Sequence, residues 1–229
     1  MDRDEGSIGG LMKPPQPTPQ LFLVSVVMDI TALICALYIS YLFSFCLLTY
    51  ILASRAYSFR GIRLKKYPVI GYLTVIIFQG AMVFFMTYHG SSQSLTIDVP
   101  ILAVIASSLL IGGFYPLTQI YQHEADFNDG VKTLSYLLGY RGTFVFTAII
   151  YVCAMGVLAQ YFYLVHRENK LLVLATCMLP VLVYFFSWAA KVWKDLRFAD
   201  FKHTMTMNLL ASVCTNLAFI TLLIWRFFE

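Results

Sequence analysis

Charged residues are scarce in this sequence. Asp, Glu, Lys and Arg together make up 12% of the chain, whereas hydrophobic residues make up 59% and the mean hydropathy is +0.74. Soluble globular chains contain about 45–50% apolar and about 25% charged residues. So little charge and so much apolar sequence predict an integral membrane protein that lies in the lipid bilayer. We expect no nucleic-acid partner.

Several motifs that define classes of soluble protein are also absent. The chain contains no GxxxxGK[S/T] loop, which removes the usual soluble phosphate cradle. Its five cysteines lie in apolar runs without CxxC spacing, so neither a disulfide framework nor a zinc site is predicted. Residues 1–20 are acidic and rich in Gly and Pro, and they lack the apolar core of a cleavable signal peptide. We interpret them as a loop.

The sequence does contain a series of apolar runs separated by short polar connectors. A membrane-spanning helix needs about 20 mostly apolar residues, and residues 19–54 are too long for one such helix. We therefore divide this run near Ser40. Further helices are predicted at residues 69–88, 99–119, 142–165, 171–193 and 205–228. The predicted fold is an all-α, multi-pass transmembrane bundle of seven helices that forms a single membrane-embedded domain over residues 1–229.

The charges of the connectors predict how the bundle is oriented. Residues 54–66 carry five Lys and Arg and no acid, and residues 191–203 carry four. Basic loops preferentially face the cytoplasm. Because successive helices alternate in direction, residues 124–132 and the acidic N-terminal segment fall on the same side. We expect the active-site loops at the cytoplasmic face, although a basic loop could also simply bind anionic lipid headgroups.

Two acidic segments reach this face. Glu124, Asp126 and Asp129 lie in "YQHEADFNDGVKTLS", and Asp2 and Asp4 lie near the N-terminus. Carboxylates close to a bilayer usually face a cavity, pair with a cation or serve a function. Their hard oxygens suit Mg²⁺, which fills its remaining coordination sites with water and phosphate. The alternative is that these acids only solvate a loop and pair with its lysines.

Cations that could hold a phosphate lie in the same connectors. They are Arg60, Arg63, Lys65, Lys66 and Lys132, and together they could bind the oxygens of a diphosphate. Magnesium carboxylates, diphosphate-binding cations and an apolar helical chamber fit a lipid diphosphate better than a nucleotide.

Three motifs resemble the UbiA superfamily of intramembrane prenyltransferases. "QHEADFNDGVKT" is similar to its second aspartate motif, DxxxDxxxG followed by Lys or Arg and Thr, with Asp126 and Gly130 in place. The N-terminal "DRDE" is similar to the end of its first motif, NxxxDxxxD, with Asp2 at the first aspartate. The family's YS…RLK…P…G stretch is matched by Tyr57, Ser58, Arg63, Leu64, Lys65, Pro68 and Gly71.

The resemblance implies roles for individual residues. Asp126 and Asp2 would be catalytic metal ligands, with Asp4 as a further candidate. Gln122 stands where the family has the first aspartate of its second motif, so it would offer a neutral carbonyl oxygen, and Glu124 would substitute for the lost carboxylate. The implied diphosphate-binding residues are Tyr57, Ser58, Arg63, Lys65 and Lys132.

The resemblance also implies an activity. This is the Mg²⁺-dependent transfer of an isoprenoid group from a prenyl diphosphate to an aromatic or other lipophilic acceptor within the membrane, in quinone or related lipid synthesis. Because the family has nine helices, the chain is expected to lack the first one to two and to be N-terminally shortened. Two alternatives stay open. One is a catalytically silent, truncated membrane scaffold, and the other is a small cation-coupled transporter with carboxylates in broken mid-membrane helices.

Three further side chains carry expectations. Asp29 lies about two turns into the first predicted helix, where an acid should face the bundle, so we expect a polar contact with another helix. His123 is interpreted as a loop residue. Asp129 is left open between a functional carboxylate and a solvated loop charge.

Overall fold

Seven long helices make up most of the computed structural model, which describes residues 11–12, 15 and 18–228. They are α1 (Pro19–Leu37), α2 (Tyr41–Ser58), α3 (Pro68–Val75) continuing through a π-helical segment (Ile76–Met82) into α4 (Val83–Ser91), α5 (Ile101–Thr118), α7 (Leu134–Leu164), α8 (Glu168–Lys194) and α9 (Phe201–Arg226). A short helix, α6 (His123–Asn128), lies between α5 and α7. The described residues contain no strands, and the prediction of a seven-helix, all-α bundle is confirmed.

Polar side chains fix where several helices begin. Thr18 precedes α1 and its hydroxyl accepts a hydrogen bond from the backbone N–H of Leu21 at 3.3 Å. Ser40 does the same for α2, and Asp200 accepts from the His203 N–H at 2.7 Å at the start of α9. Such caps satisfy backbone donors that have no partner within the helix. The predicted division near Ser40 is therefore confirmed.

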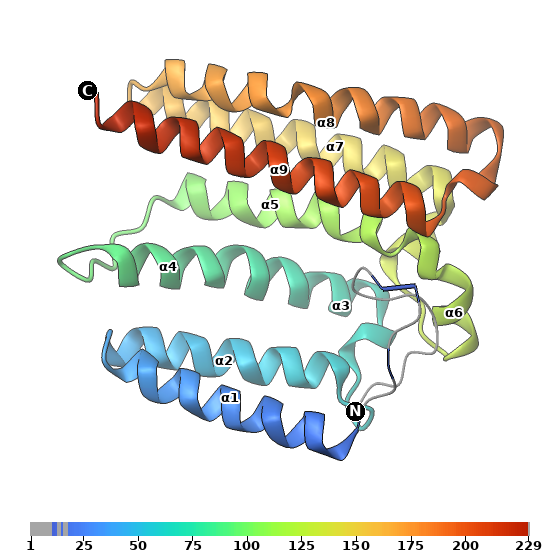
Figure 1. The fold of residues 1–229 in the computed structure, drawn as a ribbon, viewed down its shortest axis with the longest axis horizontal. Helices are drawn as coiled ribbons and strands as arrows, with labels where there is room; N and C mark the ends of the chain where they lie inside the picture. Colours follow the sequence, from blue (N-terminus) through green and yellow to red (C-terminus); the bar gives the residue numbers. More distant parts are fainter. Residues whose placement is uncertain (1–10, 13–14, 16–17, 229) are drawn as a thin grey trace.

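The connections of the bundle separate into two ends (Figure 1). The α2–α3 connection, α6 and the α8–α9 turn lie at one end, on the right of the view, whereas the α1–α2, α4–α5 and α7–α8 connections lie at the other. We call the first group the α6 end. The prediction that the polar loops converge at one face is confirmed for these three connections, and the acidic N-terminal segment lies outside the described residues. Its assignment to the cytoplasmic side stays a prediction.

Most of the helices can cross a membrane by length and composition. They are Pro19–Leu37, Pro68–Ser91, Ile101–Asn128, Leu134–Leu164, Glu168–Lys194 and Phe201–Arg226, six candidate spans among the described residues, and α2 is not one of them. Their outward faces are apolar and exposed, as at Val152 and Val183. In a bilayer such faces contact lipid, so the multi-pass membrane architecture stands.

The buried core joins α5, α7, α8 and α9. Trp188 of α8 meets the ring of Phe144 edge-on, with 4.8 Å between centroids, and its indole N–H donates to the Phe198 carbonyl at 2.7 Å. This bond ties α8 to the turn that precedes α9. The tryptophan thus fills the core while its one polar atom is satisfied.

Two elements at the α6 end differ from the prediction. Helix α7 begins at Leu134, earlier than the predicted residue 142, because Thr133 caps it and a kink at Gly139 joins two helical pieces. Gly139 has φ +67° and ψ 174°, a conformation that glycine adopts with little strain. His123 was expected in a loop, but it begins α6 and is only 5% exposed. The sequence pattern missed α6 because one and a half turns carry too little apolar periodicity.

Asp29 makes the polar helix contact that was expected of it. It forms an ion pair with Arg55 of α2, whose Nε donates to the Asp29 carboxylate at 2.9 Å. The Arg55 guanidinium also lies 5.6 Å from the centroid of the Phe22 ring. The pair joins α1 to α2 and neutralises an acid within a candidate membrane span.

Helix α5 and the π-helical segment Ile76–Met82 approach each other closely at Gly80. A Cβ atom built on Gly80 would lie 2.5 Å from the Cα of Ser108, and the Ser107 hydroxyl donates to the Gly80 carbonyl at 3.2 Å. Small residues allow such contact between membrane helices.

We expect Gly80→Ala to destabilise the bundle by about 1–3 kcal/mol, because the backbone of α5 must move to admit the methyl group. Gly156→Ala is the matched control, since nothing lies within 4 Å of a Cβ at that position. The measurement is unfolding in mixed detergent micelles. Equal stability of the two variants would contradict the close contact.

Candidate functional site

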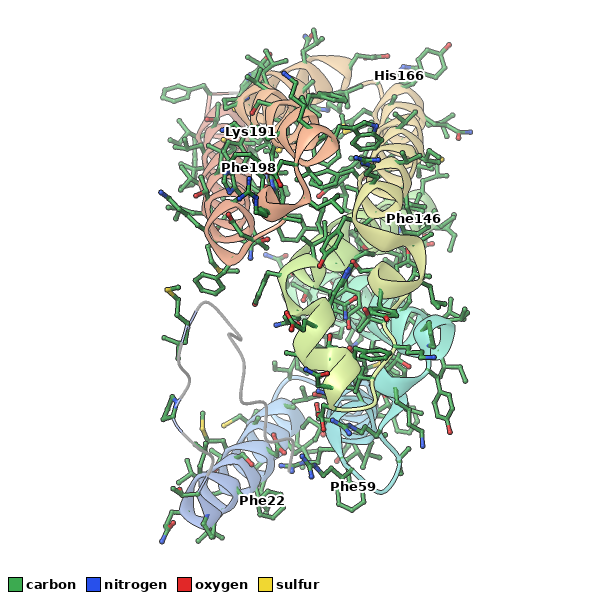
Figure 2. The ribbon with its side chains drawn as sticks, turned by 90° about the vertical axis from the view of Figure 1, so that its right-hand side faces the viewer. Phe22, Phe59, Phe146, His166, Lys191 and Phe198 are labelled. Atoms are coloured by element: carbon green, nitrogen blue, oxygen red, sulfur yellow. The ribbon has the colours of Figure 1, made fainter. Side chains whose placement is uncertain are left out.

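Two polar segments meet at the α6 end of the bundle. One is the connection between α2 and α3, and the other runs from the last turn of α5 through α6 to the start of α7. Figure 2 looks onto this end and labels Phe59 in the first segment and Phe198 in the α8–α9 turn. The basic and acidic motifs of the sequence are thereby placed side by side.

An ion pair joins the two segments directly. Arg63 donates from Nη1 to the Asp129 carbonyl at 3.2 Å, and its Nη2 bonds to the Asp129 carboxylate. The Nη2 of Arg60 lies 3.9 Å from the other carboxylate oxygen. The Arg63 side chain is only 12% exposed, so this pair is partly withdrawn from water. Asp129 is therefore a paired residue that positions Arg63 rather than a solvated loop charge.

A second polar contact joins α2 to α5. The hydroxyl groups of Tyr57 and Tyr115 share a hydrogen bond, and the amide nitrogen of Gln119 donates to the Tyr115 hydroxyl at 2.9 Å. Gln119 is 7% exposed, and its Oε1 is a buried oxygen without a hydrogen-bond partner in the described part of the chain. A buried acceptor without a donor is rare in native proteins and indicates a strained or functional position.

Asp126 lies near one member of this pair, Tyr115. Its carboxylate interacts electrostatically with the hydroxyl groups of Tyr115 and Tyr121. The side-chain amide of Gln122 donates to the Tyr121 hydroxyl at 3.0 Å. Asp126, Gln122 and the polar end of α5 thus form one group at the mouth of the bundle.

Glu124 lines a different surface of α6 from the one that carries Asp126. The two residues are about 200° apart on a helix that turns 100° per residue. Glu124 lines a cavity together with His123, Phe127 and Tyr136. Its role as a ligand of the same ion as Asp126 stays a prediction.

The remaining candidates take varied positions. Ser58 ends α2 and is half-buried, Lys65 lies half-buried in a 3-10 turn (Leu64–Lys66), and Lys132 is exposed in the connection between α6 and α7. Asp2 and Asp4 lie outside the described residues. Within the described ranges no three His, Cys, Asp or Glu side chains cluster as a metal site.

Sequence reasoning missed Tyr115, Gln119 and Tyr121. A signal existed in the segment "YPLTQIYQ", because Tyr115 and Gln119 are four residues apart and therefore share one face of α5. Their importance depends on burial and on the contact with Tyr57, and both arise only when α2 and α5 come together.

A model of the UbiA prenyltransferase family matches residues 16–210. The chain belongs to this family. Membership implies, in broad terms, prenyltransferase activity in a membrane. A search of the curated proteins and a search of the solved structures each found no significant match.

We expect Asp129→Asn to lower the free energy of unfolding by about 1.5–3 kcal/mol, because it removes a charged hydrogen-bond acceptor from partly buried Arg63. Asp195→Asn is the control. Asp195 also pairs with an arginine, Arg197, but that guanidinium is exposed to solvent, so the loss of stability should be clearly smaller. Unfolding in mixed micelles measures both, and a smaller effect at Asp129 than at Asp195 would refute its positioning role.

Proposed function

We propose that this protein transfers an isoprenoid group from a prenyl diphosphate to an aromatic or other lipophilic acceptor in the membrane. The reaction would depend on Mg²⁺ and serve quinone or related lipid synthesis. Family membership supports prenyl transfer in general. The observation that carries the proposal is the group formed by Asp126, Tyr115 and the buried, unpartnered oxygen of Gln119 where the helices end.

This group fits a magnesium ion. Mg²⁺ binds through one or two protein carboxylates and keeps several water molecules. Asp126 would supply a carboxylate, with Asp2, Asp4, Gln122 and Glu124 as the further candidate ligands. A water molecule on the ion would donate to the Gln119 Oε1, which satisfies an acceptor that otherwise costs about 1–3 kcal/mol.

Bound Mg²⁺ would offset the negative charge that develops on the leaving diphosphate. Tyr57, Ser58, Arg63, Lys65 and Lys132 would bind the diphosphate oxygens, and Arg63 is already held in place by Asp129. The allylic C–O bond breaks and its electron pair leaves with the diphosphate. The isoprenoid cation then bonds to a nucleophilic atom of the acceptor, which releases a proton. The apolar bundle keeps water, a competing nucleophile, away from the cation.

We expect Asp126→Asn to reduce Mg²⁺-dependent diphosphate release from allylic prenyl diphosphates by about 100-fold or more, because preorganised charge at the leaving group is lost. The assay uses the full chain, purified in detergent. Glu168→Gln is the control, since Glu168 begins α8 at the opposite end of the bundle. Full activity of Asp126→Asn would overturn the assignment.

Gln119→Leu tests the metal group without an activity assay. Outer contacts to a metal typically contribute 10- to 100-fold to its affinity, so we expect Mn²⁺, a spectroscopic substitute for Mg²⁺, to bind about tenfold more weakly. Electron paramagnetic resonance measures free Mn²⁺. Gln160→Leu, at an exposed glutamine near the far end of α7, should bind Mn²⁺ like the unaltered protein. Equal affinity of Gln119→Leu and Gln160→Leu would exclude a role for Gln119.

The two alternative functions make different demands. A cation-coupled transporter needs a carboxylate that is available within the membrane, and Asp29 is paired with Arg55. A silent scaffold would show neither Mn²⁺ binding that depends on Asp126 nor diphosphate release. The same two measurements therefore separate a prenyltransferase from a silent scaffold.

A further inference from the structure

The cavity that Glu124 lines lies at the α6 end, on the surface of α6 that carries this residue. Its volume is about 290 Å³, and it opens between α6 and the first turns of α7. It is lined by His123, Glu124, Phe127, Tyr136, Gly139 and Tyr140. Four of these six residues present rings, and Glu124, which is also a candidate metal ligand, presents a carboxylate.

The four rings form a continuous column. Phe127 stacks on Tyr136 with centroids 5.5 Å apart and planes 11° apart, and His123 stacks on Tyr140 at 4.7 Å and 29°. The His123 ring meets Tyr136 edge-on at 5.7 Å and so links the two pairs. Aromatic pairs in these geometries are mutually stabilising. The rings therefore make a preformed wall.

Hydrogen bonds hold this wall in place. His123 Nε2 and the Ser135 hydroxyl share a bond of 2.8 Å, and Ser135 in turn lies 3.1 Å from the Thr143 hydroxyl. Thr143 donates to the Gly139 carbonyl at 2.8 Å, across the kink of α7. The bonds fix both the ring of His123 and the bend that places Tyr136 and Tyr140 against α6.

The charge of the cavity comes from Glu124. This carboxylate is exposed and makes no hydrogen bond or ion pair with any residue that the structure describes. An anion would be repelled by it, and a neutral ligand would not require it. Ring faces attract cations through their negative quadrupole, so rings and carboxylate together select a positively charged group with apolar substituents.

We propose that this cavity binds the ammonium group of a zwitterionic phospholipid headgroup. The cavity lies where a candidate span ends and α7 begins, the level at which headgroups meet a membrane protein. Phe127, which lines the cavity, is 51% exposed, as suits a rim residue that contacts lipid. Ligand pockets for whole drug-sized molecules usually occupy about 300–1,000 Å³, so a cavity at the lower limit suits a headgroup better than a bulky substrate.

Native mass spectrometry of the intact protein tests the proposal. The protein is released from detergent after incubation with equal amounts of phosphatidylethanolamine and phosphatidylglycerol that share the same acyl chains. We expect about two- to fivefold preferential retention of phosphatidylethanolamine, and the same for phosphatidylcholine, because a cation–ring contact at an exposed site contributes about 0.5–1 kcal/mol. Equal retention of the zwitterionic and anionic lipids would overturn the proposal.

Two variants locate the effect. Glu124→Gln removes the charge at an exposed position, and Tyr136→Leu removes the central ring; both should abolish the preference. Glu168→Gln and Tyr163→Leu are the matched controls at the opposite end of the bundle and should keep it. If Glu124→Gln still prefers phosphatidylethanolamine over phosphatidylglycerol, the proposed site is refuted. This test does not depend on whether Tyr136→Leu folds.

Two further experiments are made in parallel. One asks whether the ammonium group comes from a lipid or from a soluble amine, and the other asks whether the cavity is separate from the metal site. Free choline or ethanolamine that binds in a Glu124-dependent manner, without lipid preference, would assign the cavity to a soluble amine and overturn the lipid source. Phe127→Leu alters the lining of the cavity and none of the candidate metal ligands, so this variant should bind Mn²⁺ as the unaltered protein does. Weakened Mn²⁺ binding in Phe127→Leu would show that the cavity and the metal site are one site, and would refute the proposal.

Discussion

The hydrocarbon layer imposes the constraint on which the rest of this structure depends. Backbone N–H and C=O groups that face lipid find no water, so each must be bonded within its own segment, and long helices satisfy this requirement. Polar side chains then have two places left. They can lie at helix ends, as most do here, or pair within the bundle, as Asp29 does with Arg55. The clustering of polar and charged side chains at the α6 end follows from this constraint.

At the α6 end, ion pairs determine which charged side chains are available to a ligand. Asp129 holds Arg63 and lies near Arg60, so the acidic and basic motifs are joined before any substrate binds. The short helix α6 then contributes one acid to each of two separate surfaces. Asp126 lies near Tyr115 of α5 and Tyr121 in the turn that follows α5, whereas Glu124 lines the aromatic cavity against α7. The six residues of α6 can do this because neighbouring acids two positions apart point in nearly opposite directions.

The bend of α7 links these surfaces to the core. Gly139 combines a positive φ with an extended ψ, and the chain of hydrogen bonds from His123 through Ser135 to Thr143 satisfies polar groups around it. Beyond the bend, Phe144 packs on Trp188 of α8. The position of α6 is thus set by α7, the helix whose Phe144 packs in the core. The candidate site around α6 is therefore supported by a rigid helix.

The sequence by itself determined the membrane class, the seven helices and the meeting of the polar loops at one end, because apolar runs and loop charges are local properties of the chain. It also placed Arg63 and Asp126 at that end through motifs of residue type and spacing. Only the tertiary structure decided that Asp129 pairs with Arg63, that His123 is buried, and that Gln119 carries an unpartnered oxygen beside Tyr115. Each of these depends on contact between helices far apart in the chain, which no local pattern encodes.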